Sequence, residues 1–277
     1  MLIGSYYYEL PTVFPELNVT SIYFVIFCII CFFLLWPFKN NVKPYLLFLF
    51  NCIFIWSFSK NFYYLIIVIL CSIVSYLLGL IIEETHNKII LFFGIAIYIF
   101  LLFFYKYNNL LMFTNIVIPL GLSFYSFKIM SYLIDVYRGI LHAEKNIVYY
   151  FDYVMFFPCI TAGPINRAKS FFEEIKNPIE FEYKDVKSGG FQLSLGIFEK
   201  LVFCDYIAQI VDMSLNNTEL FGLNVLIGIL LYSFQIYLDF DAASNIAIGS
   251  ARLLGFHLPK NFNRHSNHFK TQRTKNK

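Results

Sequence analysis

Long apolar runs, several of them close to the thickness of a lipid bilayer, constrain this sequence more than any other feature. An α-helix needs about 20 apolar residues to cross the hydrocarbon core of a membrane. Phe62–Ile82 and Lys88–Tyr105 meet this requirement. Hydrophobic residues make up 58% of the chain and charged residues 14%, whereas a soluble domain has roughly 25% charged residues. The sequence therefore predicts an all-α, multi-pass transmembrane protein of the cell membrane, surrounded by membrane lipids.

The apolar runs predict roughly six to eight membrane segments by the length rule. The candidates are Ser21–Phe38, Tyr45–Ser59, Phe62–Ile82, Lys88–Tyr105, Asn115–Val136, Val148–Ile160, Phe191–Met213, Leu220–Phe240 and Ala242–Phe256. Pro119 and Gly121 predict that one of them begins with a break in the helix. Val148–Ile160 is short, which predicts a re-entrant or interfacial piece. Lys and Arg lie in the connections, so the net charge of +3 reports membrane topology and not nucleic-acid binding.

Polar side chains interrupt the apolar stretch Tyr232–Asn263 at Gln235, Asp239, Asp241 and Asn245. An ionisable group at membrane depth costs about 2.5 kcal/mol or more, so such groups face protein or a water-filled path. Gln235 and Asp239 are four residues apart and share one helix face. Two interpretations stay open for this stretch: polar contacts between helices, or the lining of a substrate path.

A second polar island runs from Pro119 to Gly139. Asp135 and Arg138 are three residues apart on the predicted helix and can form an ion pair. Lys128 lies two helical turns before Asp135 and shares its face. The spacing predicts a structural polar pair, Asp135 and Arg138, that holds the end of the helix.

A third island runs from Phe156 to Ile175, where two prolines and a glycine force an irregular backbone. Irregular backbone at membrane depth is tolerated only against protein or a water-filled cavity. Arg167 and Lys169 follow the Gly-Pro turn directly. A cation on an irregular turn at a membrane surface suits an anionic or phosphate-bearing ligand. An ordinary interfacial loop accounts for the same residues.

Taken together, the three islands resemble the signatures of the membrane-bound O-acyltransferase family, in the branch of the alginate O-acetyltransferase membrane subunit. The matching blocks are Pro119–Tyr125, Asp135–Gly139, Phe157-Pro158, Ala162–Arg167, Gln235–Phe240 and Ala247–Asn263. They come in the family's order, whereas the apolar region before them carries no specific motif. The D-alanyl transferase of teichoic acid modification shares the Gly-Pro-Ile-x-Arg turn, but the other blocks are more similar to the O-acetyltransferase branch.

The resemblance implies an O-acyltransferase fold and the transfer of acyl groups, most simply acetyl, to a cell-envelope polysaccharide. The acyl donor, acetyl-CoA or another acyl thioester, would enter as a substrate from the cytoplasm, with no bound cofactor. A central tunnel would pass the acyl group to the polysaccharide or to an extracytoplasmic acetyltransferase partner protein. The residues expected to line the donor site and channel are Arg167, Gly163, Pro164, Gln235, Asp239 and Asn261.

The last residues of the chain depart from the family pattern. The family continues after Asn-Phe-Asn with a Trp-His-x-Ser-Leu motif whose histidine is the expected catalytic base or acyl relay. That histidine would fall beyond Lys277, so no catalytic residue is assigned. His265 and His268 are two histidines without a third ligand, so no metal site is predicted. We therefore expect an incomplete membrane-embedded domain over residues 1–263, an aberrant or disordered basic tail over residues 264–277, and an inactive chain; a non-catalytic remnant or scaffold is the alternative.

Overall fold

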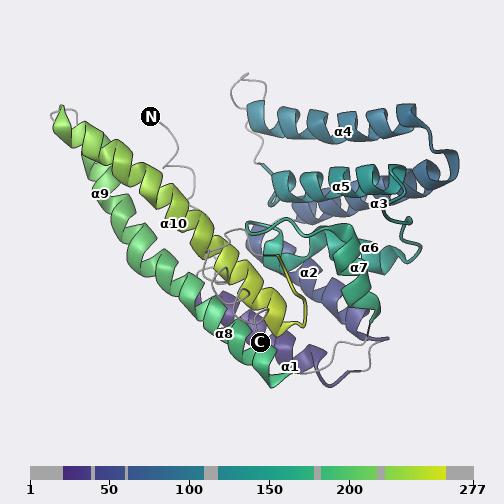
Figure 1. The fold of residues 1–277 in the computed structure, drawn as a ribbon, viewed down its shortest axis with the longest axis horizontal. Coiled ribbons are helices and arrows are strands. Elements are labelled where there is room, and N and C mark those ends of the chain that lie inside the picture. Colours follow the sequence, from purple (N-terminus) through teal and green to yellow (C-terminus); the bar gives the residue numbers. More distant parts are fainter. Residues whose placement is uncertain are drawn as a thin grey trace, which may run out of the picture. The chain divides into compact units, whose positions relative to one another are not determined.

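The computed structural model describes residues 21–38, 41–59, 62–108, 118–177, 182–216 and 222–259. Within these ranges every regular element is a helix and none is a β-strand, which confirms the predicted all-α class. The chain divides into two compact units, whose helices are labelled in Figure 1. The first unit comprises Met1–Thr161 and Arg167–Phe181, and the second comprises Ala162–Asn166 and Glu182–Lys277. The tail 264–277 and Asn261 lie outside the described residues.

The first unit is built from helices α1 to α7, with a short 3-10 turn η1. Their bounds are α1 Ile22–Leu35, α2 Lys43–Ser59, α3 Phe62–Thr85, α4 Lys88–Tyr107, α5 Leu122–Tyr137, α6 Ile147–Met155, η1 Phe157–Cys159 and α7 Ala168–Lys176. Helix α5 packs against both α3 and α4, and the three run side by side in Figure 1. Side-chain caps fix several helix starts: Asn87 Oδ1 accepts from the Ile89 N–H at 2.8 Å, and Asn146 Oδ1 accepts from the Val148 N–H at 2.9 Å.

Among the described helices, three are long and apolar enough to cross a membrane. They are α3, α4 and the part of α10 from Val225 to Leu253. Their lengths, 24, 20 and 29 residues, match the number of residues that a hydrocarbon core requires. Helices α1 and α2 are apolar but shorter. The length and composition of these helices are those of a membrane protein.

Aromatic side chains from α5, α6 and α7 fill the core of the first unit. Tyr132, Tyr150 and Tyr153 are fully buried, and their rings contact one another and Phe172. The Tyr150 hydroxyl donates to Ser75 Oγ at 2.7 Å, which satisfies a polar group that would be costly to leave unpaired. Because lipid is as apolar as these side chains, close packing and such hydrogen bonds are what favour helix contact here.

Two breaks predicted from the sequence appear in the first unit. Helix α5 begins directly after Gly121, whose φ of +69° lies in the left-handed region. The short segment Val148–Ile160 is the nine-residue helix α6 followed by η1, and the residues from Tyr150 to Ile160 are buried. Pro158 within η1 accounts for the break between the two helical pieces, since proline removes a backbone donor.

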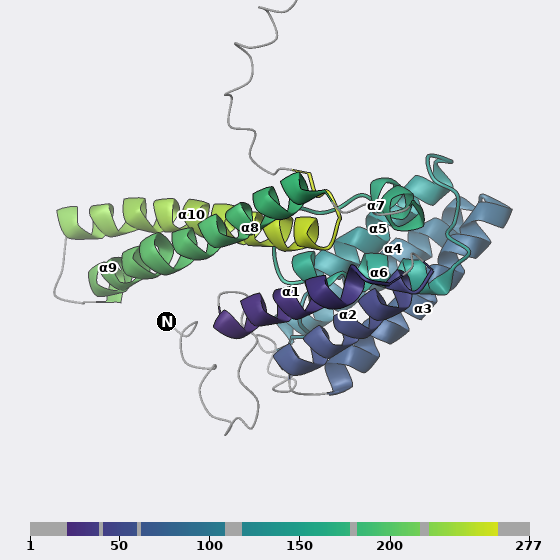
Figure 2. The same ribbon diagram turned by 90° about the horizontal axis from the view of Figure 1, so that it is seen from below.

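The second unit is a helical hairpin in which one arm changes helix type. Its helices are α8 Tyr183–Phe198, the π-helical turn η2 Glu199–Cys204, α9 Asp205–Asn216 and α10 Leu223–Leu253. The first arm, α8 to α9, packs along α10 (Figure 2). Gly189 and Gly249 allow this approach: a Cβ built on Gly249 would lie 2.4 Å from the Leu193 nitrogen.

Helix α10 corrects one sequence prediction. The sequence predicts two segments here, Leu220–Phe240 and Ala242–Phe256, but α10 is continuous for 31 residues. No glycine or proline lies between Phe240 and Ala242, so the backbone has no reason to break there. The helix ends where predicted: Gly255 adopts a φ of +87°, and the Phe256 N–H donates to the Ala251 carbonyl at 2.9 Å.

Candidate functional site

A cavity of about 480 Å³ opens along one face of α5 in the first unit. The residues that line it are Ile95, Phe127, Met130, Ser131, Ile134, Asp135, Arg138, Ile140 and Arg167. The lining residues from α5 follow one another at intervals of three residues and one residue alternately. This spacing places them on a single face of the helix. One end of the cavity is apolar, with Ile95 and Phe127, whereas the other carries a carboxylate and two guanidinium groups. The cavity can therefore accept a molecule with an apolar part and an anionic part.

The Gly139 turn at the end of α5 sets the position of Arg138. Gly139 adopts a φ of +69°, and its N–H donates to the Val136 carbonyl at 3.0 Å. The Ile140 N–H donates to the Asp135 carbonyl, also at 3.0 Å. This pair of hydrogen bonds is the Schellman arrangement, in which glycine ends a helix with its last carbonyls satisfied. The turn brings Arg138 and Ile140 to the same cavity wall.

Arg167 reaches the same cavity from another part of the chain. It is the N-cap residue of α7, with extended backbone angles of −79° and 140°, and its side chain is exposed. Asp135 and Arg138 line the cavity beside it, but no ion pair joins these two residues. Among the residues that the structure describes, none forms an ion pair with Arg138 or Arg167. Both guanidinium groups are thus available for bidentate contacts with a carboxylate or phosphate.

The Gly-Pro turn belongs to the second unit. Gly163 adopts a φ of +114°, which an L side chain rarely tolerates, and both Gly163 and Pro164 are buried. This conformation explains the glycine in the Ala-Gly-Pro block. The predicted role of Gly163 and Pro164 in a substrate channel stays a prediction.

Asp239 on α10 is held by Lys200, a partner that the sequence analysis did not assign. Lys200 Nζ lies 2.7 Å from Asp239 Oδ1 and 3.8 Å from Asp205 Oδ1. Lys200 lies in the π-helical turn η2, and such turns often occur at functional sites. The charged run Glu199, Lys200 and Asp205 inside an apolar segment was the signal that could have indicated this pairing.

Asn245 makes a second polar link between α10 and the opposite arm. Its Nδ2 donates to Glu199 Oε2 at 2.9 Å, and its Oδ1 accepts from Gln192 Nε2 at 3.3 Å. The Oε1 atom of Gln235 is buried and has no hydrogen-bond partner among the described residues. Polar contacts between helices therefore account for Asp239 and Asn245, whereas the lining of a substrate path by Gln235 and Asp239 stays a prediction.

Replacing Lys200 by methionine is expected to destabilise the second unit, because Asp239 then loses its close cation on an apolar helix. We expect a loss of about 2 kcal/mol in the free energy of unfolding, similar to the cost of one uncompensated charge in a membrane helix. Thermal unfolding of the purified protein in detergent measures it. Lys187→Met, an exposed lysine on α8, is the matched control. Equal unfolding midpoints for the two variants would contradict the pairing.

The described residues contain no group of three or more His, Cys, Asp or Glu side chains that could hold a metal ion. The histidines His265 and His268 lie outside the described residues. The described residues form a cavity with two arginines and an apolar wall in the first unit. In the second unit, polar contacts join α10 to the opposite arm: Lys200–Asp239, Asn245–Glu199 and Asn245–Gln192. These features suit the binding of an amphipathic anion at a membrane.

A helical membrane protein with a cavity lined by two arginines and apolar side chains is the class that fold and site define. Its relatives are more specific. The chain is 33% identical to the probable alginate O-acetylase AlgI of Azotobacter vinelandii over 150 residues, which is 54% of this chain and 30% of the relative. It is 27% identical to the peptidoglycan O-acetyltransferase of Helicobacter pylori over 269 residues, 81% of this chain and 51% of the relative. No protein-family profile matches.

The teichoic acid D-alanyltransferase of Bacillus subtilis is also a relative, 28% identical over 156 residues, which is 54% of this chain and 39% of that protein. These relatives confirm the predicted resemblance to the membrane-bound O-acyltransferases. The chain spans between about a third and a half of the length of these curated relatives.

Proposed function

We propose that the chain takes part in O-acyl transfer, most simply of acetyl groups, to a cell-envelope polysaccharide, and that the α5 cavity binds the acyl donor. The observation that carries this proposal is the meeting of Arg138 and Arg167 beside an apolar wall. An acyl thioester has an apolar acyl part and, in nucleotide donors such as acetyl-CoA, several phosphates. Guanidinium groups bind phosphate with two parallel hydrogen bonds.

The distribution of cations in the first unit supports a cytoplasmic position for the cavity. His142 Nδ1 lies 2.9 Å from Glu83 Oε1, so the loop after α5 meets the end of α3. Lys and Arg gather at this end of the unit: Lys88, Arg138, Lys145, Arg167, Lys169 and Lys176. Lys106 lies at the other end of α4. Lys and Arg favour the cytoplasmic side of a membrane, where an acyl thioester is made.

We assign the polar contacts between α10 and the opposite arm of the second unit to binding the uncharged reactants. An acyl group and a sugar hydroxyl are both uncharged, so they need hydrogen-bonding side chains and not a net charge. Lys200 pairs with Asp239, and the Asn245 amide donates to the Glu199 carboxylate, so hydrogen-bonding side chains join α10 to the opposite arm. Gln235, whose buried Oε1 is unpaired among the described residues, is the side chain best suited to contact a passing hydroxyl.

Arg138→Gln and Arg167→Gln are each expected to weaken binding of radiolabelled acetyl-CoA to the purified, reconstituted protein by about tenfold to a hundredfold. This range corresponds to losing one hydrogen-bonded charge contact, about 1.5–3 kcal/mol. Lys106→Gln, an exposed lysine of the same unit, is the matched control and should bind normally. Equal binding by all four proteins, or binding only from the outer face of oriented vesicles, would overturn the donor site.

Ester-linked groups released from the envelope of expressing cells by mild alkali test the transfer itself. Released acetate that falls in the Arg167→Gln strain is the result expected from this proposal, and it would overturn the inactivity expected from the sequence. Released D-alanine would favour the second candidate, D-alanyl transfer to teichoic acid, which the relative from Bacillus subtilis supports. No increase in either ester over cells without the protein would assign a non-catalytic role to the chain.

A further inference from the structure

A second cavity, of about 550 Å³, lies in the first unit between the loop from α5 to α6 and the helix α7. The residues that line it are Ile140, Leu141, His142, Ala143, Glu144, Lys145, Lys169, Phe172, Glu173 and Lys176. Those from α7 are spaced by three, one and three residues and share one face. Ile140 is the one residue that lines both this cavity and the α5 cavity.

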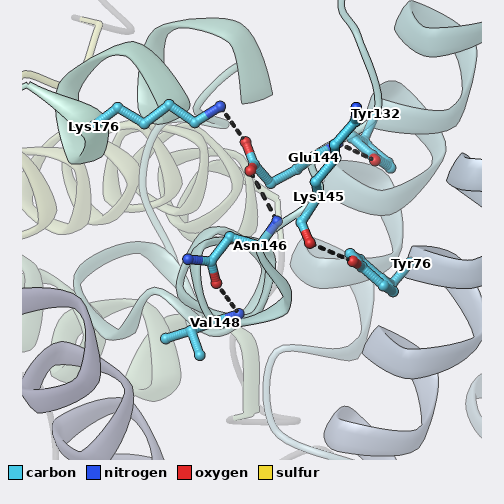
Figure 3. A network of polar contacts seen from close by, with 7 residues as sticks. All are labelled: Tyr76, Tyr132, Glu144, Lys145, Asn146, Val148 and Lys176. Atoms are coloured by element: carbon cyan, nitrogen blue, oxygen red, sulfur yellow. Dashed lines mark hydrogen bonds and ion pairs between the residues drawn. The ribbon is translucent and has the colours of Figure 1, made fainter.

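A network of hydrogen bonds fixes the loop that forms one wall of this second cavity (Figure 3). The buried carboxylate of Glu144 accepts from the Asn146 N–H at 3.0 Å and pairs with Lys176 Nζ at 2.5 Å. The Glu144 N–H donates to the Tyr132 hydroxyl at 3.2 Å, and the Tyr76 hydroxyl donates to the Lys145 carbonyl at 2.7 Å. The wall is therefore preorganised, so a ligand need not order it on binding.

The depth of this cavity follows from the end of α3. At 24 residues, α3 is about 36 Å long, whereas the hydrocarbon core is about 30 Å thick. Its last turns, including Glu83, therefore lie among the lipid headgroups. Glu83 bonds His142 of the cavity wall at 2.9 Å, which places the cavity at the same level. Helix α7 has the composition of an interfacial helix: Phe171, Phe172 and Ile175 are buried, whereas its charged residues are exposed or half-buried.

The charges around the cavity favour an anion. Glu144 is already paired with Lys176, and His142 contacts Glu83. Lys145 and Lys169 remain as exposed ammonium groups facing one exposed carboxylate, Glu173. Beside them lie apolar side chains, including Ile140, which is 52% exposed. Two cations next to exposed apolar groups at headgroup depth match the phosphate and glycerol region of a phospholipid.

We propose that this cavity binds the headgroup of an anionic membrane phospholipid. Lys145 and Lys169 contact the phosphate, and Ile140 and Leu141 contact the glycerol and the first methylenes of the acyl chains. The lipid would join α7 to the loop after α5, and so hold Arg167 at the start of α7 near Arg138. This role is independent of the identity of the acyl donor.

Native mass spectrometry of the full chain released from nanodiscs tests the proposal. The nanodiscs contain equal amounts of phosphatidylglycerol and phosphatidylcholine. We expect the wild-type chain to retain phosphatidylglycerol, and Lys145→Gln/Lys169→Gln to retain about 10- to 30-fold less, since each lysine near an anionic surface contributes about a factor of five. The matched control, Lys184→Gln/Lys187→Gln, removes two exposed lysines from α8 and should retain the lipid.

Both substitutions leave the Glu144–Lys176 pair and the Lys145 carbonyl contact in place, so the fold should persist; equal unfolding midpoints check this. Equal lipid loss in both double variants would mean general attraction to charge and would overturn the site. Equal retention of phosphatidylcholine would do the same. Displacement of the lipid by acetyl-CoA or inorganic phosphate would assign the cavity to a soluble anion instead, and would leave the α5 donor site to be judged on the arginine variants.

Discussion

Replacing Gly121 by alanine is expected to prevent the first unit from folding stably. Gly121 begins α5 with a φ of +69°, which costs an alanine about 1–2 kcal/mol. A Cβ at this position would also lie 2.3 Å from the Ile160 carbonyl oxygen and 2.8 Å from Ile160 Cγ1. Backbone oxygen cannot move aside as a flexible side chain can, so overpacking adds about 1–3 kcal/mol. The expected total, about 2–5 kcal/mol, is a large part of the stability of a single domain.

Gly139→Ala separates the two causes. Gly139 has the same φ of +69°, but nothing lies within 4 Å of a Cβ built there. Only the backbone term, about 1–2 kcal/mol, should then appear. The yield of monodisperse protein and the thermal midpoint in detergent measure both variants. A Gly121→Ala protein as stable as Gly139→Ala would show that α5 and Ile160 are not in close contact.

The start and end of α5 could be predicted from the sequence because local chemistry determines both. Pro119 and Gly121 indicated the break, and Gly139 follows the last helical turn where a left-handed residue is needed. The meeting of Arg167 with Arg138 was not predicted: the sequence assigned Arg138 to a pair with Asp135 and Arg167 to the donor site or channel. The apolar wall that includes Ile95 could not be predicted, because in a membrane protein an apolar side chain looks the same whether it faces lipid, protein or a cavity.

The polar contacts of the second unit could not be predicted from the sequence for a different reason. Helical-wheel reasoning assumes 3.6 residues per turn, and the π-helical turn Glu199–Cys204 changes that period. Side chains within and after the π-helical turn therefore point in other directions about the helix axis than a regular α-helix predicts. For this reason the sequence did not indicate that Lys200 faces Asp239. The sequence prediction ended one segment at Phe240 and began the next at Ala242, whereas α10 continues through both residues and Lys200 pairs with Asp239 within the hairpin.

Replacing Asn51 by leucine is expected to cost the first unit about 2–6 kcal/mol, because two buried polar groups each lose their hydrogen-bond partner at about 1–3 kcal/mol. Asn51 and Asp152 are both fully buried. Asn51 Nδ2 donates to Asp152 Oδ1 at 3.0 Å, and Asn51 Oδ1 accepts from the Phe157 N–H at 2.9 Å. One amide thus joins α2, α6 and η1, and leucine satisfies neither group although it has a similar size.

The double variant Asn51→Leu/Asp152→Leu decides which group carries this cost. Asp152 Oδ2 has no hydrogen-bond partner among the described residues, so the carboxyl depends on Asn51 alone. If the orphaned carboxyl carries most of the cost, the double variant will be more stable than Asn51→Leu by about 1–3 kcal/mol. The two thermal midpoints give the answer, and the coupling follows from the double-mutant cycle. A double variant no more stable than Asn51→Leu would mean that the Phe157 N–H, and with it the position of η1, is what Asn51 secures.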